Sequence, residues 1–307
     1  MERSVYRKIT AMSMEEAQLE KSIGYLAEHL GHFLRKQERV MICFLSTGRG
    51  SLGWLMEQAV LRCGAIPVVW GPNRLWSTLL RQAFSNKTSA IIGPPLILLG
   101  LTKLIRHSGV PLYVRKVITA AYPCPDWMID GLVKGFDCEV GGCFSLGEST
   151  VVAGFACGHS WGVHLREDAY GVDIVDREGK HLPDGQLGEM MLYPKEHPDH
   201  RYPMGDLARL EKEVCPCGSH APRLLDMQPG DLDPDLIQLG DSLQRWTSVL
   251  DCRLKKGESG LEIEIVCFPG EQLPKLPSAA KLVIRPWDPA VDEPFPYHSG
   301  PVKGFLG

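Results

Sequence analysis

Short apolar runs alternate with longer amphipathic segments between residues 14 and 142, and this alternation constrains the fold more than any other feature. Ser13 and Glu16 form a capping-box pattern, and apolar residues then recur at helical spacing, which predicts a helix over 14–36. The later segments predict strands at 39–45, 65–70, 89–93, 116–120 and 138–142 and helices at 51–64, 73–84, 95–107 and 125–134. Such alternation forms βαβ units around a parallel sheet, which binds ligands at the carboxyl ends of its strands.

After Gly142 the sequence changes to short β-rich runs separated by turn residues. This texture predicts a mainly antiparallel β subdomain over 143–226, following an α/β subdomain over 1–142. The proline-, glycine- and aspartate-rich stretch 227–242 is expected to be a linker, and 243–307 a small α+β domain that contains a hairpin. The expected fold class is therefore α/β, with a parallel-sheet βαβ subdomain, a β subdomain and a small C-terminal α+β domain.

Composition limits the classes of function. With 307 residues, 44% hydrophobic and 23% charged, the chain resembles a soluble globular protein large enough for two domains. A net charge of -4, with scattered lysines and arginines, argues against nucleic acid as a partner. The N-terminus has no apolar signal-peptide core, and Gly93, Pro94 and Pro95 interrupt the longest apolar run. Neither secretion nor membrane spanning is expected, and we predict a cytoplasmic protein.

Ten cysteines in a reducing compartment are more often core residues or metal ligands than disulfides. Cys215 and Cys217 are one residue apart, too close to bond to each other without severe strain. Cys157 and His164 flank a glycine-containing turn that can aim both side chains at one point. Three cysteines and one histidine are a normal closed tetrahedral set for structural zinc.

The spacing alone leaves two alternatives open. His159 or His220 could be the fourth ligand in place of His164. It is also open whether the two cysteines of CPCG are incidental thiols of a turn and Cys157 a core residue, because Cys-x-Cys is a less specific spacing than paired Cys-x-x-Cys motifs.

Four stretches carry a resemblance to a known family: GGCFSLGES, FACGHSWGVHLREDAYGVDIVDREGKHLPDGQLGEMMLY, RYPMGDLARL and CPCGSHAPRL. In this order they resemble the phenylacetate–CoA ligase and coenzyme F390 synthetase branch of the adenylate-forming (AMP-binding) superfamily. The similarity is good over 115–225, extends to 39–115 and is faint beyond 226. It implies a shortened acid–CoA ligase fold with a structural zinc. The family's Cys-x₆-His and Cys-x-Cys pattern selects His164 as the fourth ligand beside Cys157, Cys215 and Cys217.

The resemblance also implies nucleotide-binding roles. The family's Y-G-x-T-E stretch falls on residues 144–148. This places Ser145 and Gly147 beside the nucleotide and makes Glu148 the carboxylate that helps to hold Mg²⁺ on the phosphates. The family's Y-R-T-G-D-L stretch makes Asp206 the carboxylate that binds the ribose hydroxyls of an adenylate. A carboxylate can accept two hydrogen bonds from such a diol.

The sequence departs from the family in three respects. The serine-, threonine- and glycine-rich phosphate loop with its lysine is absent. FLSTGRGSLGW is a glycine-rich junction between a strand and a helix that could hold an anion, with Arg49 as the phosphate contact. Gly147 and Met204 stand where the family has threonines. Lys303, or Lys281, is a loose counterpart of the lysine that the family's C-terminal domain brings to the adenylate.

Three functions follow as hypotheses. The first is an AMP-forming acid–thiol ligase that uses ATP and Mg²⁺ to convert a small carboxylic acid into an acyl-AMP and an acyl thioester of CoA or a carrier protein. The second is a non-catalytic, zinc-stabilised binding protein or partner subunit. The third is ATP-independent acyl transfer with Cys143 as the nucleophile. The expected partners are the acid or the acyl thioester, and a homodimer or a protein partner is left open.

Overall fold

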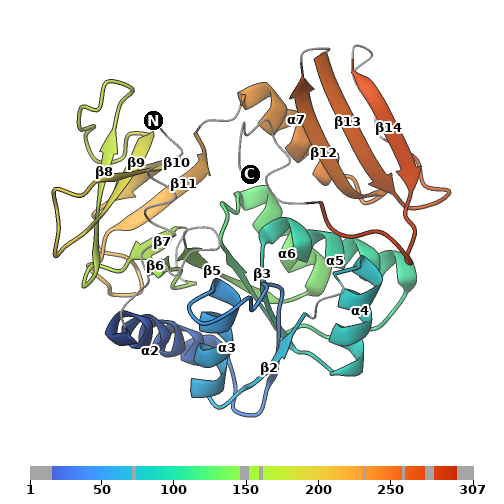
Figure 1. The fold of residues 1–307 in the computed structure, drawn as a ribbon, viewed down its shortest axis with the longest axis horizontal. Coiled ribbons are helices and arrows are strands. Elements are labelled where there is room, and N and C mark those ends of the chain that lie inside the picture. The colour runs from blue at the N-terminus through green and yellow to red at the C-terminus, as the bar shows by residue number, and fades with distance from the viewer. Residues whose placement is uncertain are drawn as a thin grey trace.

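The structure, a computed structural model, describes residues 16–70, 74–145, 152–158, 162–230, 233–257, 260–273 and 280–295. Its main feature is one 11-stranded sheet with the order β2-β1-β3-β4-β5-β6-β7-β11-β10-β9-β8 (Figure 1). The first five strands in this order pair in parallel. They are β2 (Ile66–Val69), β1 (Arg39–Ile42), β3 (Ala90–Gly93), β4 (Lys116–Ala120) and β5 (Glu139–Ser145).

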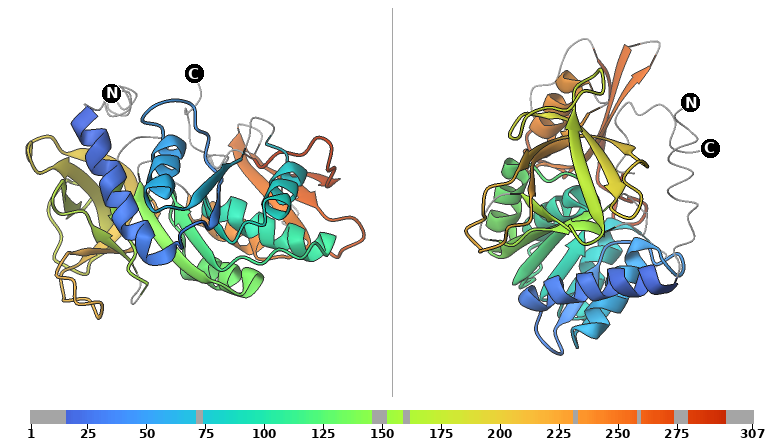
Figure 2. Two further views of the ribbon diagram at one scale, coloured as in Figure 1. Left: turned by 90° about the horizontal axis from the view of Figure 1, so that it is seen from below. Right: turned by 90° about the vertical axis from the view of Figure 1, so that its left-hand side faces the viewer.

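Helices cover both faces of this parallel half (Figure 2). The five helices are α2 (Glu16–Phe33), α3 (Leu52–Arg62), α4 (Trp76–Ser85), α5 (Pro95–Ser108) and α6 (Asp126–Phe136). α2 and α3 share one apolar core with Ile118, whereas α4, α5 and α6 share the other with Val117. These two neighbours on β4 point to opposite faces because a strand alternates its side chains. The α/β expectation for this half is confirmed.

The other six strands continue the same sheet. They are β6 (Val152–Phe155), β7 (Val163–Leu165), β8 (Tyr170–Val175), β9 (Gly188–Pro194), β10 (Tyr202–Glu211) and β11 (Arg223–Pro229). β6 pairs antiparallel with β5, with Cys143 opposite Phe155, and the strands beyond it are antiparallel to their neighbours. The antiparallel texture of 143–226 was predicted, but the two expected subdomains share one mixed sheet, because pairing between β5 and β6 joins them.

The strand order reverses beside β1. From β1 the chain passes through α3 to β2 on one side, and then through α4 to β3 on the other side of β1. In open α/β sheets, ligands bind in the crevice outside the carboxyl ends of the strands at such a reversal. The segment after β1, the segment after β3 and the ends of β4 and β5 form this edge of the sheet.

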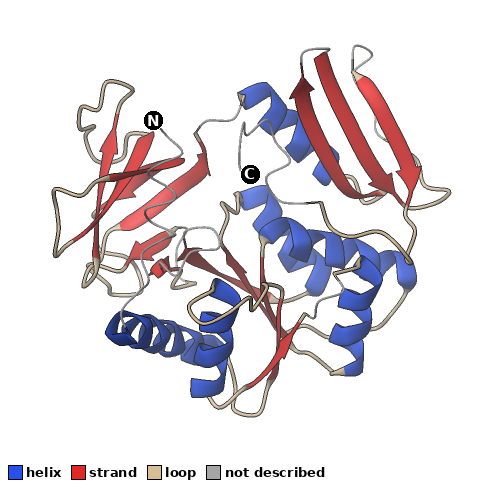
Figure 3. Ribbon diagram, viewed as in Figure 1, coloured by secondary structure: helices blue, strands red, loops and turns tan. Residues whose placement is uncertain are grey.

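The C-terminal part forms a second sheet, which Figure 3 shows apart from the first, beyond a group of helices. The strands of this sheet are β12 (Val249–Gly257), β13 (Gly260–Cys267) and β14 (Lys281–Pro286), and the helix α7 (Pro234–Gln244) precedes them. β12 and β13 form the expected antiparallel hairpin, and β14 adds in parallel to β13.

The stretch 227–242, expected to be a linker, holds the end of β11 and most of α7. The side chain of Asp233 accepts a hydrogen bond from the amide of Asp235, and Pro234 occupies the first turn of the helix. Aspartate and proline are favoured at these positions because the first amides of a helix have no partner within it. The aspartate and proline that indicated a linker therefore mark the start of a helix.

No helix in the described ranges is both long enough and apolar enough to cross a lipid bilayer.

Candidate metal centre and nucleotide-binding edge

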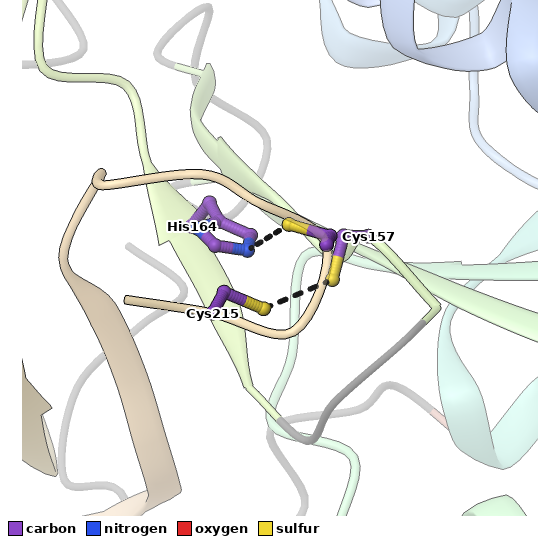
Figure 4. Close-up of side chains that lie close together, drawn as sticks. Cys157, His164 and Cys215 are labelled. Carbon is purple, nitrogen blue, oxygen red and sulfur yellow. Dashed lines mark hydrogen bonds between the residues drawn. The ribbon is translucent and has the colours of Figure 1, made fainter. Parts of the chain in front are cut away.

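Four side chains of the types that bind metals, from three separate segments, lie close together. Cys157 follows β6, His164 lies in β7, and Cys215 and Cys217 lie in the loop between β10 and β11. Their ligand atoms all lie within 4.8 Å of one another, and Figure 4 shows three of these side chains pointing toward one another. The strand order explains the meeting, because β7 pairs with β6 on one side and with β11 on the other.

The distances within the cluster fit a tetrahedral zinc site. The sulfurs of Cys157 and Cys215 are 3.7 Å apart, and the sulfur of Cys217 lies 3.5 Å from Nε2 of His164. Zinc–sulfur bonds of about 2.3 Å and zinc–nitrogen bonds of about 2.0 Å give tetrahedron edges of about 3.8 Å between two sulfurs and about 3.5 Å between sulfur and nitrogen. The four donors match the set expected for a closed structural site, with no position left for a substrate.

The ring of His164 is oriented by a backbone carbonyl. Its Nδ1 lies 3.1 Å from the carbonyl oxygen of Ala221, and a hydrogen bond here requires the proton to be on Nδ1. Nε2, which faces the sulfur of Cys217, then carries the free lone pair that a metal needs. The side chain is 7% exposed, so few water molecules reach it.

The loop that carries two of the cysteines closes on itself. The amide of Gly218 donates to the carbonyl of Cys215 at 2.8 Å, and the amide of Cys215 donates to the carbonyl of Ser219 at 3.0 Å. Gly218 has a φ of 88°, a conformation that side chains other than glycine rarely adopt. Reversal at this glycine turns Cys215 inward, where it is 2% exposed. Of the competing histidines, His220 is exposed and outside the cluster, and His159 lies outside the described residues.

The nucleotide residues expected from the resemblance are described only in part. Ser145 ends β5 at the carboxyl edge of the parallel strands. It is 3% exposed, and its hydroxyl has no hydrogen-bond partner among the described residues. Gly147 and Glu148 lie outside the described residues, as does Lys303.

Asp206 lies in β10, in an irregular stretch of that strand. The register between β10 and β9 shifts between Pro203 and Leu207, and Gly205 has a φ of 73°. β-bulges of this kind re-aim side chains and are common beside binding sites. Met204 is buried in the core of the antiparallel half, and Asp206 is half-buried opposite Pro229 of β11.

Arg49 has a carboxylate partner in the structure. Its guanidinium forms an ion pair with Glu16 of α2 and lies 5.5 Å from the ring centre of Trp54. Two backbone amides near Arg49 donate hydrogen bonds within the same loop. The amide of Ser51 donates to the carbonyl of Gly48, and the amide of Trp54 donates to the hydroxyl of Ser51. These two amides are therefore engaged within the loop.

Of the other two described candidates, Cys143 is buried and Lys281 is ion-paired. Cys143 lies on β5 within the core shared by α2 and α3, and burial raises the pKa of its thiol to about 12. A thiol in this environment stays protonated near neutral pH, which disfavours its use as a nucleophile. Lys281 starts β14, is mostly exposed and forms an ion pair with Glu262.

Two features, one at the Cys/His cluster and one at the carboxyl edge of the parallel strands, could not be predicted from the sequence. The carbonyl of Ala221, which orients His164, belongs to a residue whose side chain takes no part. Ala121, directly after β4, has a φ of 72° although it is not a glycine. Strain of this kind at the carboxyl end of a central strand is common at ligand sites.

No protein-family model matches the sequence, and no curated protein sequence matches it. Among solved structures, 2-hydroxyisobutyryl-CoA ligase in the postadenylation state with 2-HIB-AMP matches with a TM-score of 0.69 and 15% identity, over 91% of this chain and 68% of the ligase. The same ligase in the thioesterification state with 2-HIB-AMP and CoA matches with a TM-score of 0.62 and 17% identity, over 83% of this chain and 59% of the ligase.

The anthranilate CoA ligase AuaEII with anthranoyl-AMP matches with a TM-score of 0.56 and 17% identity, over 86% of this chain and 60% of that ligase. At such low identities these likenesses concern the fold. The described residues have the fold of adenylate-forming acyl-CoA ligases, over about two-thirds of the length of the first of them.

Proposed function

We propose that the chain is a shortened protein of the acid–CoA ligase type that binds an acyl adenylate at the carboxyl edge of its parallel strands. The observation that carries this proposal is the likeness of 91% of the chain to a ligase solved with an acyl adenylate. The strand-order reversal beside β1 supports the same edge, as does the buried hydroxyl of Ser145 at the end of β5, which has no hydrogen-bond partner within the described ranges.

In this proposal Asp206 accepts hydrogen bonds from the two ribose hydroxyls, and the buried hydroxyl of Ser145 donates to the adenylate. Both groups belong to strands of the same sheet, so the fold can hold them in fixed positions. Glu148 is proposed as the ligand of a Mg²⁺ ion on the phosphates, and Lys303 as the lysine brought to the adenylate. Mg²⁺ would neutralise charge on the pyrophosphate when it is bound.

We also propose that Cys157, His164, Cys215 and Cys217 hold a structural zinc ion. When bound, the metal ties the end of β6 and the β10–β11 loop to β7, because its ligands come from all three segments. A loop of this length has few apolar side chains of its own to pack. The zinc ligand set is also the feature that supports the finer assignment to the phenylacetate–CoA ligase branch.

ATP–pyrophosphate exchange tests the proposal. The purified chain is incubated with Mg²⁺, ATP, labelled pyrophosphate and a panel of aryl and fatty acids. We expect acid-dependent label in ATP, reduced at least about tenfold in an Asp206→Asn variant because a charge-assisted hydrogen bond is lost. The matched control is Asp184→Asn, an exposed carboxylate of the same antiparallel half. Absence of exchange with every acid would reject adenylate formation.

A second candidate is a protein that binds an acyl adenylate without forming it. Two observations favour it: Arg49 is engaged by Glu16, and the apolar Met204 occupies a buried position where the resembled family has a threonine. Forming an adenylate needs cations and donors around the departing pyrophosphate. Tight binding of a non-hydrolysable acyl-AMP mimic, measured by calorimetry, together with no exchange would identify this function.

A further inference from the structure

The C-terminal sheet shares a core with the helices of the large sheet. Leu250 of β12, Val266 of β13 and Phe268 directly after β13 are each about 1% exposed and belong to the same apolar cluster as α4, α5 and α6. His107 of α5 stacks on Phe268, with ring centres 4.2 Å apart. Moving this sheet away would expose these side chains to water, which opposes separation.

A buried polar network crosses the same contact. The ammonium of Lys103 in α5 donates to the carbonyl of Val249 at 2.8 Å and to the side chain of Gln244 at 3.1 Å. Gln244, at the end of α7, in turn donates to the carboxylate of Asp251 at 3.3 Å. Lys103 is 5% exposed, so few water molecules can take the place of Gln244 and Val249 as hydrogen-bond partners while the sheet is docked. The two bonds of Lys103 therefore depend on one relative position of α5 and the C-terminal elements.

The segment that follows β14 holds the contact from a second side. The carbonyl of Asp292 accepts from the amide of Trp76 at 3.0 Å, and the carbonyl of Pro289 accepts from the hydroxyl of Ser77 at 2.6 Å. The amide of Phe295 then donates to Asp251 at 2.8 Å. Residues 287–295 thus join the start of α4 to the buried carboxylate of β12.

We infer that the C-terminal sheet stays docked on α4 and α5 in one position throughout the working cycle of the protein. The solved ligase states point to which position this is. The chain matches the postadenylation state over 91% of its length and the thioesterification state over only 83%. The TM-score falls likewise, from 0.69 to 0.62, so the arrangement of the chain is nearer to that of the postadenylation state.

The consequence for the reaction rests on the proposed function, whereas the docking itself does not. A chain held in this position keeps the acyl adenylate on its own edge and does not reach the arrangement that the ligase takes with CoA. The adenylate must then be consumed by an acyl-transfer reaction in which another protein binds the thiol or amine acceptor. Added CoA should increase AMP release by less than about twofold, while pyrophosphate exchange proceeds.

Hydrogen exchange at one amide tests the docking. The amide of Trp76 donates across the contact to Asp292, whereas the amide of Cys43 donates to Ile92 within the large sheet. If the sheet never lifts off, both amides exchange only on global unfolding, and their rates, corrected for sequence, agree within about tenfold. NMR of the full-length protein measures both. A Trp76 rate about 1,000-fold higher than the Cys43 rate would overturn the inference.

The same measurement is repeated with MgATP, benzoate and CoA, and with variants. Phe268→Ala should speed exchange at Trp76 by at least about tenfold more than at Cys43, because it weakens the contact of the sheet with α5 beyond its effect on global stability. His107→Ala is the milder second variant, and Leu282→Ala, on the exposed face of β14, is the matched control with no effect. Loss of protection at Trp76 on adding CoA contradicts the inference, as does an unchanged Trp76 in both interface variants. Absent pyrophosphate exchange with a protected Trp76 rejects only the proposed function.

Discussion

His164 is oriented as the proposed zinc site requires. One ring nitrogen faces the carbonyl of Ala221, and the other faces the sulfur of Cys217. Since the carbonyl can only accept, it fixes the proton on Nδ1 and keeps Nε2 available. Binding of the proposed zinc ion would therefore cost this side chain little rotational freedom.

At the residue scale, Cys217→Ser should remove the metal. We expect about one zinc ion per chain in the native protein and close to none in the variant, because a serine hydroxyl is a poor zinc ligand. The variant should also melt at least about 5 °C lower, since metal binding contributes to folding. Cys138→Ser, at a half-buried cysteine outside the cluster, is the control. Equal zinc contents, measured by atomic emission, would disprove the site.

Asp206 allows a second prediction at this scale. Asp206→Asn should weaken binding of an acyl-AMP mimic by about 10- to 100-fold, because a charge-assisted hydrogen bond contributes about 1.5–3 kcal/mol. Adenine alone should bind both proteins equally, since it lacks the ribose diol. Titration calorimetry checks both ligands, and an equal loss for adenine would show that the substitution disturbs the strand and not the recognition of ribose.

At the element scale, the first half of the fold could be predicted closely. The strand expected at 116–120 is β4, and the helix expected at 95–107 is α5, one residue longer. Such elements can be predicted from local periodicity, because the apolar residues of each buried face recur at the spacing of a helix or a strand. α7 could not be predicted, because its proline and aspartates are equally typical of a loop and of a helix start. The pairing of β5 with β6 is a long-range contact that no local pattern encodes.

The proposed zinc ligands could likewise be predicted only in part. The sequence could assemble the three cysteines and a histidine as candidates, but spacing alone left His164, His159 and His220 open. The meeting of these segments depends on the position of β7 between β6 and β11. That position is a property of the sheet, so it is visible only in three dimensions.

The junction between β1 and α3 allows a prediction for an element. A Cβ atom on Gly53 would lie 2.3 Å from the carbonyl oxygen of Leu45, a contact that backbone cannot relieve without moving. Gly53→Ala should therefore destabilise the protein by about 2–4 kcal/mol. Gly31→Ala is the matched control in α2, where a Cβ meets nothing within 4 Å, and it should stabilise by about 0.5–1 kcal/mol. Urea unfolding of both variants checks the opposite signs, and equal effects would contradict this steric account.

At the scale of the whole molecule, the docked C-terminal sheet is the feature furthest from sequence-based prediction. Lys103 lies in a mostly apolar helix, where a lysine side chain normally extends to water. The sequence around it does not predict Gln244 or Val249 as its hydrogen-bond partners. The two halves of the contact are more than a hundred residues apart. Only the three-dimensional arrangement shows that the small domain expected at 243–307 depends on α5 for part of its core.

This contact predicts how stability depends on pH. Burial lowers the pKa of Lys103 to about 8 and raises the pKa of Asp251 to about 6. The folded state therefore binds more protons than the unfolded state between about pH 4 and 6, and fewer between about pH 8 and 10.5. Stability from Asp251 is greatest below pH 4 and is lost as the pH rises through 6. Stability linked to Lys103 increases as the pH rises from 8 to 10.5.

The contribution of the pair is thus lowest near neutral pH, where both groups are charged. Burial also raises the pKa of Cys252, which faces Lys103, to about 12, so this thiol stays neutral across the range. Lys103→Met should abolish the rise above pH 8, a difference on the order of 3 kcal/mol, whereas Lys281→Met on exposed β14 should keep it. Urea unfolding at pH 7 and pH 10 measures the difference. Parallel profiles for the native chain and Lys103→Met would mean that the ammonium is hydrated, and that the contact is open in solution.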